Sequence, residues 1–178
     1  MQTALTFFIR KKDRLWALIP KLSSYLRIFY TAYPSASYPE ILEKDNRPYN
    51  CLLIETHYDL YICLPYRTHV NHGYAFRFRR SLRSRSNRSG IDYSKMVIVR
   101  DQSYISNVPS TVDQDEYRET MQSINIIVND AVAYLDDYIA YMNGSSDISQ
   151  QEFNRKYGRS SLVYFNDILG INAHTEET

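Results

Sequence analysis

The feature that most constrains the fold is a helical apolar stripe in the second half of the chain. Between Asp113 and Asn143 apolar residues recur at steps of three and four: Tyr117, Met121, Ile124, Val128, Ala131, Leu135, Tyr138 and Met142. This spacing predicts one long amphipathic helix whose apolar face must be covered by another layer of structure. Asp113 and Glu116 stand in capping-box spacing at its start, and Gly144 follows its end.

A layer of strands precedes this helix. Residues 49–64, YNCLLIETHYDLYICL, form two short apolar runs around a turn near His57–Asp59, which is the pattern of a β-hairpin. A further strand is predicted at Ser94–Arg100, after the turn-forming SGID at 89–92. Strands followed by helices indicate an α+β fold, in which helices pack around a twisted antiparallel sheet.

Shorter helices are predicted after the long one. Ser149 and Glu152 form a second capping-box pattern, and residues 160–170 begin with a serine cap and stop at glycine. A chain of 178 residues suits a single domain, 1–178. The basic, amphipathic stretch LTFFIRKKDRLWALIP falls in residues 1–20, a possible extra N-terminal segment that we expect to form a surface helix.

Cysteine content and hydropathy indicate the compartment. Cys51 and Cys63 are the only cysteines, and no apolar run approaches the roughly 18 residues of a membrane span, so we expect a reduced, cytoplasmic protein without a membrane partner. A zinc site from these cysteines with His69 and His72 would need the spacing C-x11-C-x5-H-x2-H, which matches no usual pattern. We therefore predict neither a metal nor another cofactor.

Positive charge is concentrated in the middle of the chain. Residues 67–100 carry nine Lys or Arg and one acid, Asp92. Within them, residues 76–90 (the basic segment) read FRFRRSLRSRSNRSG and contain no acid. Arginine binds phosphate and stacks on bases, so this segment is a candidate track for RNA or DNA; a solvated, partly disordered loop is the alternative. The candidate contacts are Arg77, Arg79, Arg80, Arg83, Arg85 and Arg88.

The stretch PYRTHVNH, residues 65–72, holds groups suited to phosphodiester chemistry. Pro65 lacks a ladder N–H and is predicted to close the second hairpin strand, which would place Tyr66–His72 on a loop. Cleaving RNA without a metal requires a base for the 2′-hydroxyl, cations for the phosphorane and an acid for the 5′-oxygen. Histidines, an arginine and a threonine supply these groups, although such residues are also common in polar turns.

Four stretches in order resemble the toxins of type III toxin–antitoxin systems. They are NRPYNCLLIE at 46–55, ICLPYRTHVNHGYAF at 62–76, SGIDYSKMVIV at 89–99 and RKYGRSSLVYFNDILGI at 155–171. The TenpN branch is the most similar, ToxN, AbiQ and CptN are more distant, and the likeness covers residues 25–171. The resemblance implies a metal-independent endoribonuclease with a ToxN-like, barrel-like sheet core.

The same resemblance implies the partners. Such toxins are inhibited by a small repetitive RNA antitoxin, expected to form a pseudoknot, which the protein processes and binds in a closed protein–RNA oligomer. Cellular or phage RNA would be the substrate, and growth arrest with phage defence the outcome.

Five positions match the family's catalytic pattern: Thr68, Arg67, His72, Lys95 and Arg47. The resemblance assigns Thr68, where serine is commoner, to orienting the phosphate or the 2′-hydroxyl, His72 to proton transfer, and the three cations to the phosphorane.

Further RNA contacts are predicted around this loop. The candidates are Tyr66 and Tyr74, whose rings could stack on bases, together with Asn71 and with His69, which stands where asparagine is usual. The alternative to an enzyme is a non-catalytic RNA-binding protein that uses the basic segment.

Overall fold

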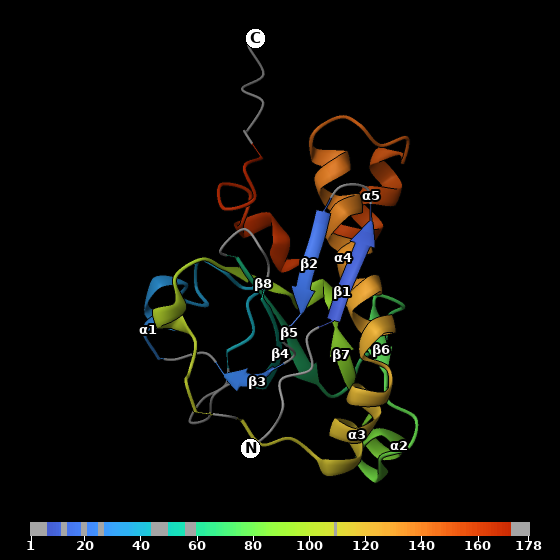
Figure 1. The fold of residues 1–178 in the computed structure, drawn as a ribbon. Helices are drawn as coiled ribbons and strands as arrows, with labels where there is room; N and C mark the ends of the chain where they lie inside the picture. Colours follow the sequence, from blue (N-terminus) through green and yellow to red (C-terminus); the bar gives the residue numbers. More distant parts are fainter. Residues whose placement is uncertain are drawn as a thin grey trace.

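An antiparallel sheet forms the centre of the protein (Figure 1). The structure, a computed structural model, describes residues 7–11, 14–18, 21–24, 27–43, 50–55, 60–108 and 110–171. The strands follow the order β3-β4-β5-β7-β6, and β8 also pairs with β5. Their bounds are β3 Lys21–Ser24, β4 Asn50–Glu55, β5 Tyr61–Arg67, β6 Ala75–Arg77, β7 Gly90–Asp92 and β8 Val97–Val99. The predicted α+β class with an antiparallel sheet is confirmed, and the described strands form an open sheet rather than a closed barrel.

Strand β5 is the central strand. It pairs with β4 in the register Leu53↔Cys63, which confirms the predicted hairpin; the turn near His57–Asp59 lies outside the described residues. On its other side β5 pairs first with β8, through Tyr61–Cys63, and then with β7, through Tyr66 and Arg67. One strand therefore links the buried hairpin to the segment that carries the candidate site.

The prediction that Pro65 closes this strand is wrong. Pro65 lies inside β5, opposite Cys51, and the strand continues to Arg67. The neighbour of β5 changes from β8 to β7 between Cys63 and Tyr66, so the missing N–H of proline falls where the ladder on that side is interrupted. Tyr66 consequently lies in the sheet and not on the loop.

The region predicted as a turn and one strand has a different local structure. Gly90–Asp92 is strand β7 rather than a turn, and of the predicted 94–100 strand Val97–Val99 forms the strand β8. Between them Tyr93–Lys95 forms the 3-10 helix η1, because the Asp92 side chain caps it by accepting from the Ser94 amide.

The predicted long helix is two helices. α3 spans Gln114–Gln122 and α4 spans Ile124–Met142, with a break at Ser123 (φ −111°, ψ 13°). Asp113 caps α3 as predicted, although no bond from the Glu116 side chain back to the cap completes the box. At the other end, Gly144 (φ +69°) and the residue after it bond back to α4 in a Schellman motif, as Gly144 predicted.

The remaining helices are short. α5, Gln150–Tyr157, carries the predicted capping box, in which both Ser149 and Glu152 make their bonds. Residues 160–170 start at the predicted serine cap but form the 3-10 helix η3, Ser161–Tyr164, and a turn. α1 spans Arg27–Ala32.

The N-terminal stretch forms strands instead of the expected surface helix. β1, Phe7–Lys11, and β2, Arg14–Leu18, pair as an antiparallel hairpin. Short apolar runs interrupted by charged residues also occur in paired strands, so the basic amphipathic character of the stretch does not by itself indicate a helix.

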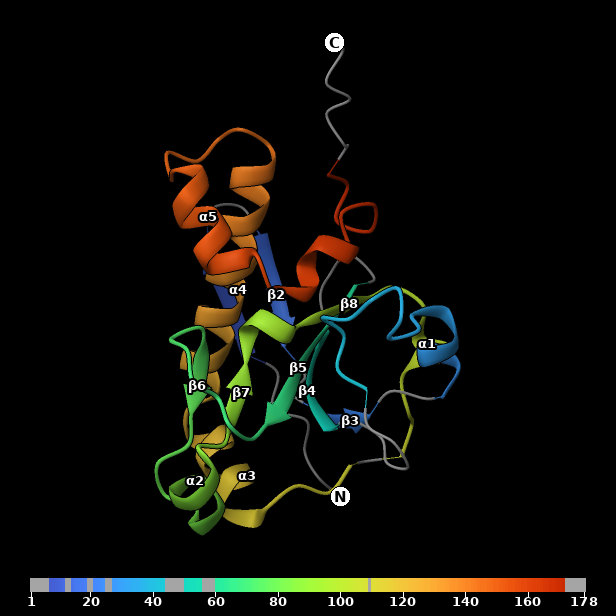
Figure 2. The same ribbon diagram turned by 180° about the vertical axis from the view of Figure 1, so that it is seen from behind.

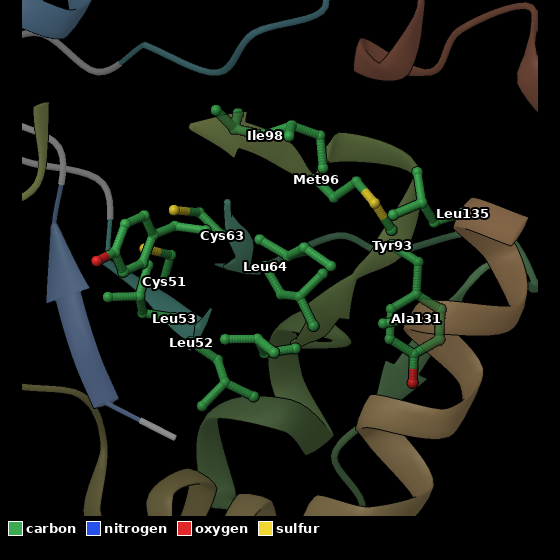
Figure 3. Close-up of a cluster of buried hydrophobic side chains, with 14 of the residues drawn as sticks. Cys51, Leu52, Leu53, Cys63, Leu64, Tyr93, Met96, Ile98, Ala131 and Leu135 are labelled. Carbon is green, nitrogen blue, oxygen red and sulfur yellow. The ribbon is translucent and has the colours of Figure 1, made fainter. Parts of the chain in front are cut away.

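The core lies between the sheet and α4 (Figure 3). Leu52 and Leu64 from the hairpin, Met96 from the turn after η1, and Ala131 and Leu135 from α4 are all buried there. Tyr138 and Tyr157 are among the largest fully buried side chains, so much of the tyrosine content is structural. In the described ranges no helix has the length and apolarity to cross a membrane.

Candidate functional site

Arg67, His72 and Asp92 meet at the end of the β5–β7 pair. Arg67 Nη1 donates to Asp92 Oδ2 at 2.5 Å, and His72 Nε2 lies 3.3 Å from the same oxygen. Arg67 ends β5, Asp92 ends β7, and pairing of these strands brings the two residues together. Two of the five predicted catalytic residues, Arg67 and His72, therefore contact the same oxygen of the Asp92 carboxylate.

Asp92 is a buried anion. Its side chain is 0% exposed, and its Oδ1 accepts from the Ser94 amide (2.9 Å) and the Ser94 hydroxyl (2.7 Å). Burial acts to raise the pKa of Asp92, but hydrogen bonds from His72 and Ser94 and the charge of Arg67 outweigh it and lower the pKa below its ordinary value. The carboxylate is therefore ionised at neutral pH.

Both ring nitrogens of His72 are bonded. Nδ1 accepts from the Tyr74 amide at 3.2 Å, so the ring proton belongs on Nε2, where it faces Asp92. The ring is 34% exposed and stacks on Tyr74, with centroids 6.0 Å apart. To accept a proton from RNA, Nδ1 must exchange the Tyr74 amide for a substrate hydroxyl.

Thr68 and His69 present free side chains on a fixed backbone. Neither the threonine hydroxyl nor the imidazole of His69 bonds to any described residue. The His69 amide donates to the Asn87 carbonyl (2.6 Å), the Val70 amide donates to the Arg88 carbonyl (3.1 Å), and His69 adopts a left-handed φ of 59°. These backbone hydrogen bonds attach the loop to the basic segment, while the Thr68 hydroxyl and the His69 imidazole remain accessible.

Lys95 and Arg47 do not join this cluster in the structure. The Lys95 ammonium pairs with the Glu40 carboxylate and donates to the Arg159 carbonyl at 2.7 Å, leaving the side chain 12% exposed. Lys95 would have to leave Glu40 before it could contact a phosphate. Arg47 lies outside the described residues.

The basic segment has regular secondary structure. It includes Phe76 and Arg77 of β6 and the whole of the helix α2, Leu82–Asn87. Ser81 caps α2 by accepting from the Ser84 amide, and Arg88 ends it in a left-handed conformation (φ 49°). These local bonds give the arginine-rich stretch a defined shape.

Two acids of α3 hold the basic segment. Glu119 accepts from the backbone amides of Arg79 (2.9 Å) and Arg80 (3.1 Å). Glu116 accepts from the hydroxyls of Ser81 and Ser89 and lies 3.4 Å from Arg83 Nη1. Both acids are buried, and α2 lies beside α3 in both views (Figures 1 and 2).

The arginine side chains are largely left on the surface. Arg77 donates to the His72 carbonyl (2.8 Å), Arg88 to Asn71 Oδ1 (2.8 Å) and Arg80 to Gln122 Oε1 (2.6 Å). Five of the six are exposed: Arg77, Arg79, Arg80, Arg85 and Arg88. Of the predicted RNA contacts, Arg77 and Arg88 therefore border the loop that holds Thr68 and His72.

The two candidate stacking tyrosines differ. Tyr66 is 4% exposed, its ring stacks on Phe78 and its hydroxyl bonds to Thr120 Oγ1 at 2.9 Å, so no face of the ring is open to a base. Burial raises the pKa of Tyr66, so it stays a neutral phenol. Tyr74 is half-buried between His72 and Tyr134 and borders the site.

Sequence reasoning missed the acids that organise the site. Asp92 matches no motif, yet a single acid among the nine basic residues of 67–100 is itself a signal of a paired carboxylate. Glu116 was assigned to a capping box, and Glu119 carried no recognisable motif.

Among the residues that the structure describes, no group of three or more His, Cys, Asp or Glu side chains is arranged so that it could hold a metal ion. Cys51 and Cys63 are both buried, on β4 and β5 respectively. Comparisons with protein-family models, with curated proteins and with solved structures find no match to this chain.

Proposed function

We propose that this protein is a metal-independent endoribonuclease, the toxin of a type III toxin–antitoxin system. One observation supports the chemistry: a buried carboxylate aligns Arg67 and His72 beside the free hydroxyl of Thr68, next to an ordered, arginine-rich surface. The sequence resemblance supplies the toxin system and the ToxN-like architecture, and the low cysteine content supports a cytoplasmic setting. It also supplies the partners: a repetitive RNA antitoxin in a closed protein–RNA assembly, and cellular or phage RNA as substrate.

In the proposed reaction the RNA 2′-oxygen attacks the adjacent phosphorus and the bond to the 5′-oxygen breaks. The 5′-oxygen takes a proton from solvent as it leaves, so the products are a 2′,3′-cyclic phosphate and a 5′-hydroxyl. Arg67 stabilises the charge of the phosphorane with donors not used by Asp92, and Thr68 orients a phosphate oxygen. His72 accepts the 2′-hydroxyl proton on Nδ1 once RNA replaces the Tyr74 amide there, and Asp92 stabilises the imidazolium.

Thr68→Ala is the direct test. In excess EDTA, purified RNA-free protein should cut a mixed RNA into discrete products, and the variant should cut at least about 100-fold more slowly, because the transition state loses a positioned hydroxyl. Rates come from denaturing gels. The control is Thr111→Ala, an exposed threonine whose recorded bond is made by its backbone carbonyl.

Two outcomes would contradict this proposal in different ways. Unchanged cleavage by the Thr68 variant would show that the site is misplaced. Absence of cleavage by the unmodified protein would favour the second candidate, a non-catalytic RNA-binding protein. One observation favours that candidate: both His72 nitrogens and the Lys95 ammonium are occupied by protein groups.

Substitution of the two loop histidines, His69 and His72, should have very different effects on the rate of RNA cleavage. His72→Gln is expected to lower the single-turnover cleavage rate about 100-fold, since glutamine cannot carry the proton. His69→Asn should cleave at close to the rate of the unmodified protein, because asparagine keeps a polar side chain at this predicted RNA contact and tolerates the left-handed φ of that position. A large loss in the His69 variant with little loss in the His72 variant would instead make the imidazole of His69 the proton carrier.

A further inference from the structure

We propose that Asp92 is the positioning residue of this site: its Oδ2 sets the orientation of Arg67 and His72, while its Oδ1 fixes the carboxylate to η1. This inference rests on the proposed function, because it concerns how the same site is aligned. Neither the sequence motifs nor the resemblance assigned a role to this residue.

The two oxygens of Asp92 serve different partners. Oδ2 faces Arg67 Nη1 and His72 Nε2, whereas Oδ1 accepts, among the described residues, from the amide and hydroxyl of Ser94. The side chain is fully buried, so water does not compete for these bonds. The alignment of the site can therefore be changed at Oδ2 while the bonds at Oδ1 are kept.

A negative charge at Oδ2 fixes both neighbours. It holds the imidazole proton on Nε2, which keeps the Nδ1 lone pair available for a substrate proton. It also fixes one corner of the planar Arg67 guanidinium, and with it the direction of the remaining donors. Arg67 is 24% exposed, so those donors can still reach a phosphate.

Asp92→Asn replaces one of the two acceptor oxygens, Oδ2, with an amide group that donates hydrogen bonds. The amide oxygen can keep both bonds from Ser94, whereas the amide nitrogen then presents hydrogens to the donors of Arg67 and His72. If the histidine changes tautomer to accept from the amide, its new Nδ1 proton faces the Tyr74 N–H. Either response misaligns the site without removing volume from the core.

The chain contains a matched control. Asp101 caps the 3-10 helix η2, Gln102–Tyr104, by accepting from the Ser103 amide at 2.8 Å, just as Asp92 caps η1. Both occur in the pattern Asp-x-Ser, but Asp101 is exposed and its recorded side-chain bond is to Ser103 alone. Asp101→Asn therefore removes the same capping charge away from the site.

The experiment measures single-turnover cleavage and RNA affinity in EDTA, with circular dichroism as the folding check. Asp92→Asn should cleave about 100-fold more slowly while binding RNA no more weakly, since it removes a negative charge. Asp101→Asn should leave both quantities unchanged. Cleavage by Asp92→Asn at the rate of the Asp101 variant would overturn the positioning role, as would a parallel loss of affinity in a folded protein.

A second measurement needs no variant and so does not depend on the folding of one. The ¹⁵N and ¹H resonances of the His72 ring in the unmodified protein report its tautomer, which should be Nε2–H. A ring protonated on Nδ1 alone would overturn the proposal. Absence of cleavage by the unmodified protein would overturn the proposed function and with it this role, whereas cleavage by both proteins alike overturns only the role of Asp92.

Discussion

Arg67→Met should lower the free energy of unfolding by about 3–5 kcal/mol at pH 7, the usual cost of leaving a buried charge without its partner. Methionine fills much of the volume of the arginine stem but leaves the fully buried Asp92 carboxylate without the guanidinium that lies 2.5 Å from it. Urea unfolding followed by circular dichroism measures the change. The double variant Arg67→Met/Asp92→Asn should recover part of the loss, because it carries no buried charge at this position.

At acid pH, the free energies of unfolding of Arg67→Met and of the unmodified protein should become equal. The pKa of Asp92 is lowered from its ordinary value of 3.8, so its ionised form contributes stability that is complete above that value. The contribution is lost as the pH falls through the lowered pKa of the folded state. The two unfolding free energies should therefore converge below about pH 4; a gap of constant size would assign the effect to packing.

Gly90→Ala should destabilise the protein by about 3 kcal/mol, at the upper end of overpacking costs. Gly90 lies on β7 directly between Arg67 of β5 and Arg77 of β6. A Cβ there would come closer than 3.0 Å to the Phe76 carbonyl oxygen and within 3.3 Å of the Arg77 Cα. Both are backbone atoms of a paired strand and cannot rotate away, so β6 must separate from β7.

Gly73→Ala is the control for this change. A Cβ at Gly73, in the connection between β5 and β6, would meet nothing within 4 Å. Urea unfolding should show little change for this variant, and amide hydrogen exchange should remain slow in β6 and β7, whereas Gly90→Ala should accelerate it. Similar losses for the two variants would contradict the β6–β7 register.

Structural features that depend on residues close together in the sequence could be predicted from the sequence alone. The β4–β5 hairpin, the caps at Asp113 and Ser149 and the glycine after α4 all follow from short patterns. The break at Ser123 was not predictable, because the apolar stripe continues in register across it. What separates α3 from α4 is their partners: acids of α3 bind the basic segment, and α4 packs on the sheet.

In the candidate site, too, residues close together in the sequence could be predicted, whereas contacts made through the tertiary structure could not. Arg67, Thr68 and His72 could be grouped because they lie within six residues of one another. Asp92 reaches them only through the pairing of β5 with β7, and Lys95 is held by Glu40, which lies 55 positions away in the chain. Tyr66 was misplaced because the effect of Pro65 on the strand depends on which strands flank it.

The attachment of the basic segment to α3 has a consequence during protein synthesis. Every described residue of the proposed site, from Arg67 to Lys95, precedes Glu116 and Glu119 in the chain. The loop closed by the pairing of Arg67 with Gly90 is short, so its entropic cost is small and it can form before the C-terminal helices are made. A nascent chain that ends before α3 would carry these side chains without the two carboxylates that hold the basic segment, so translation of α3 completes the proposed RNA-binding surface.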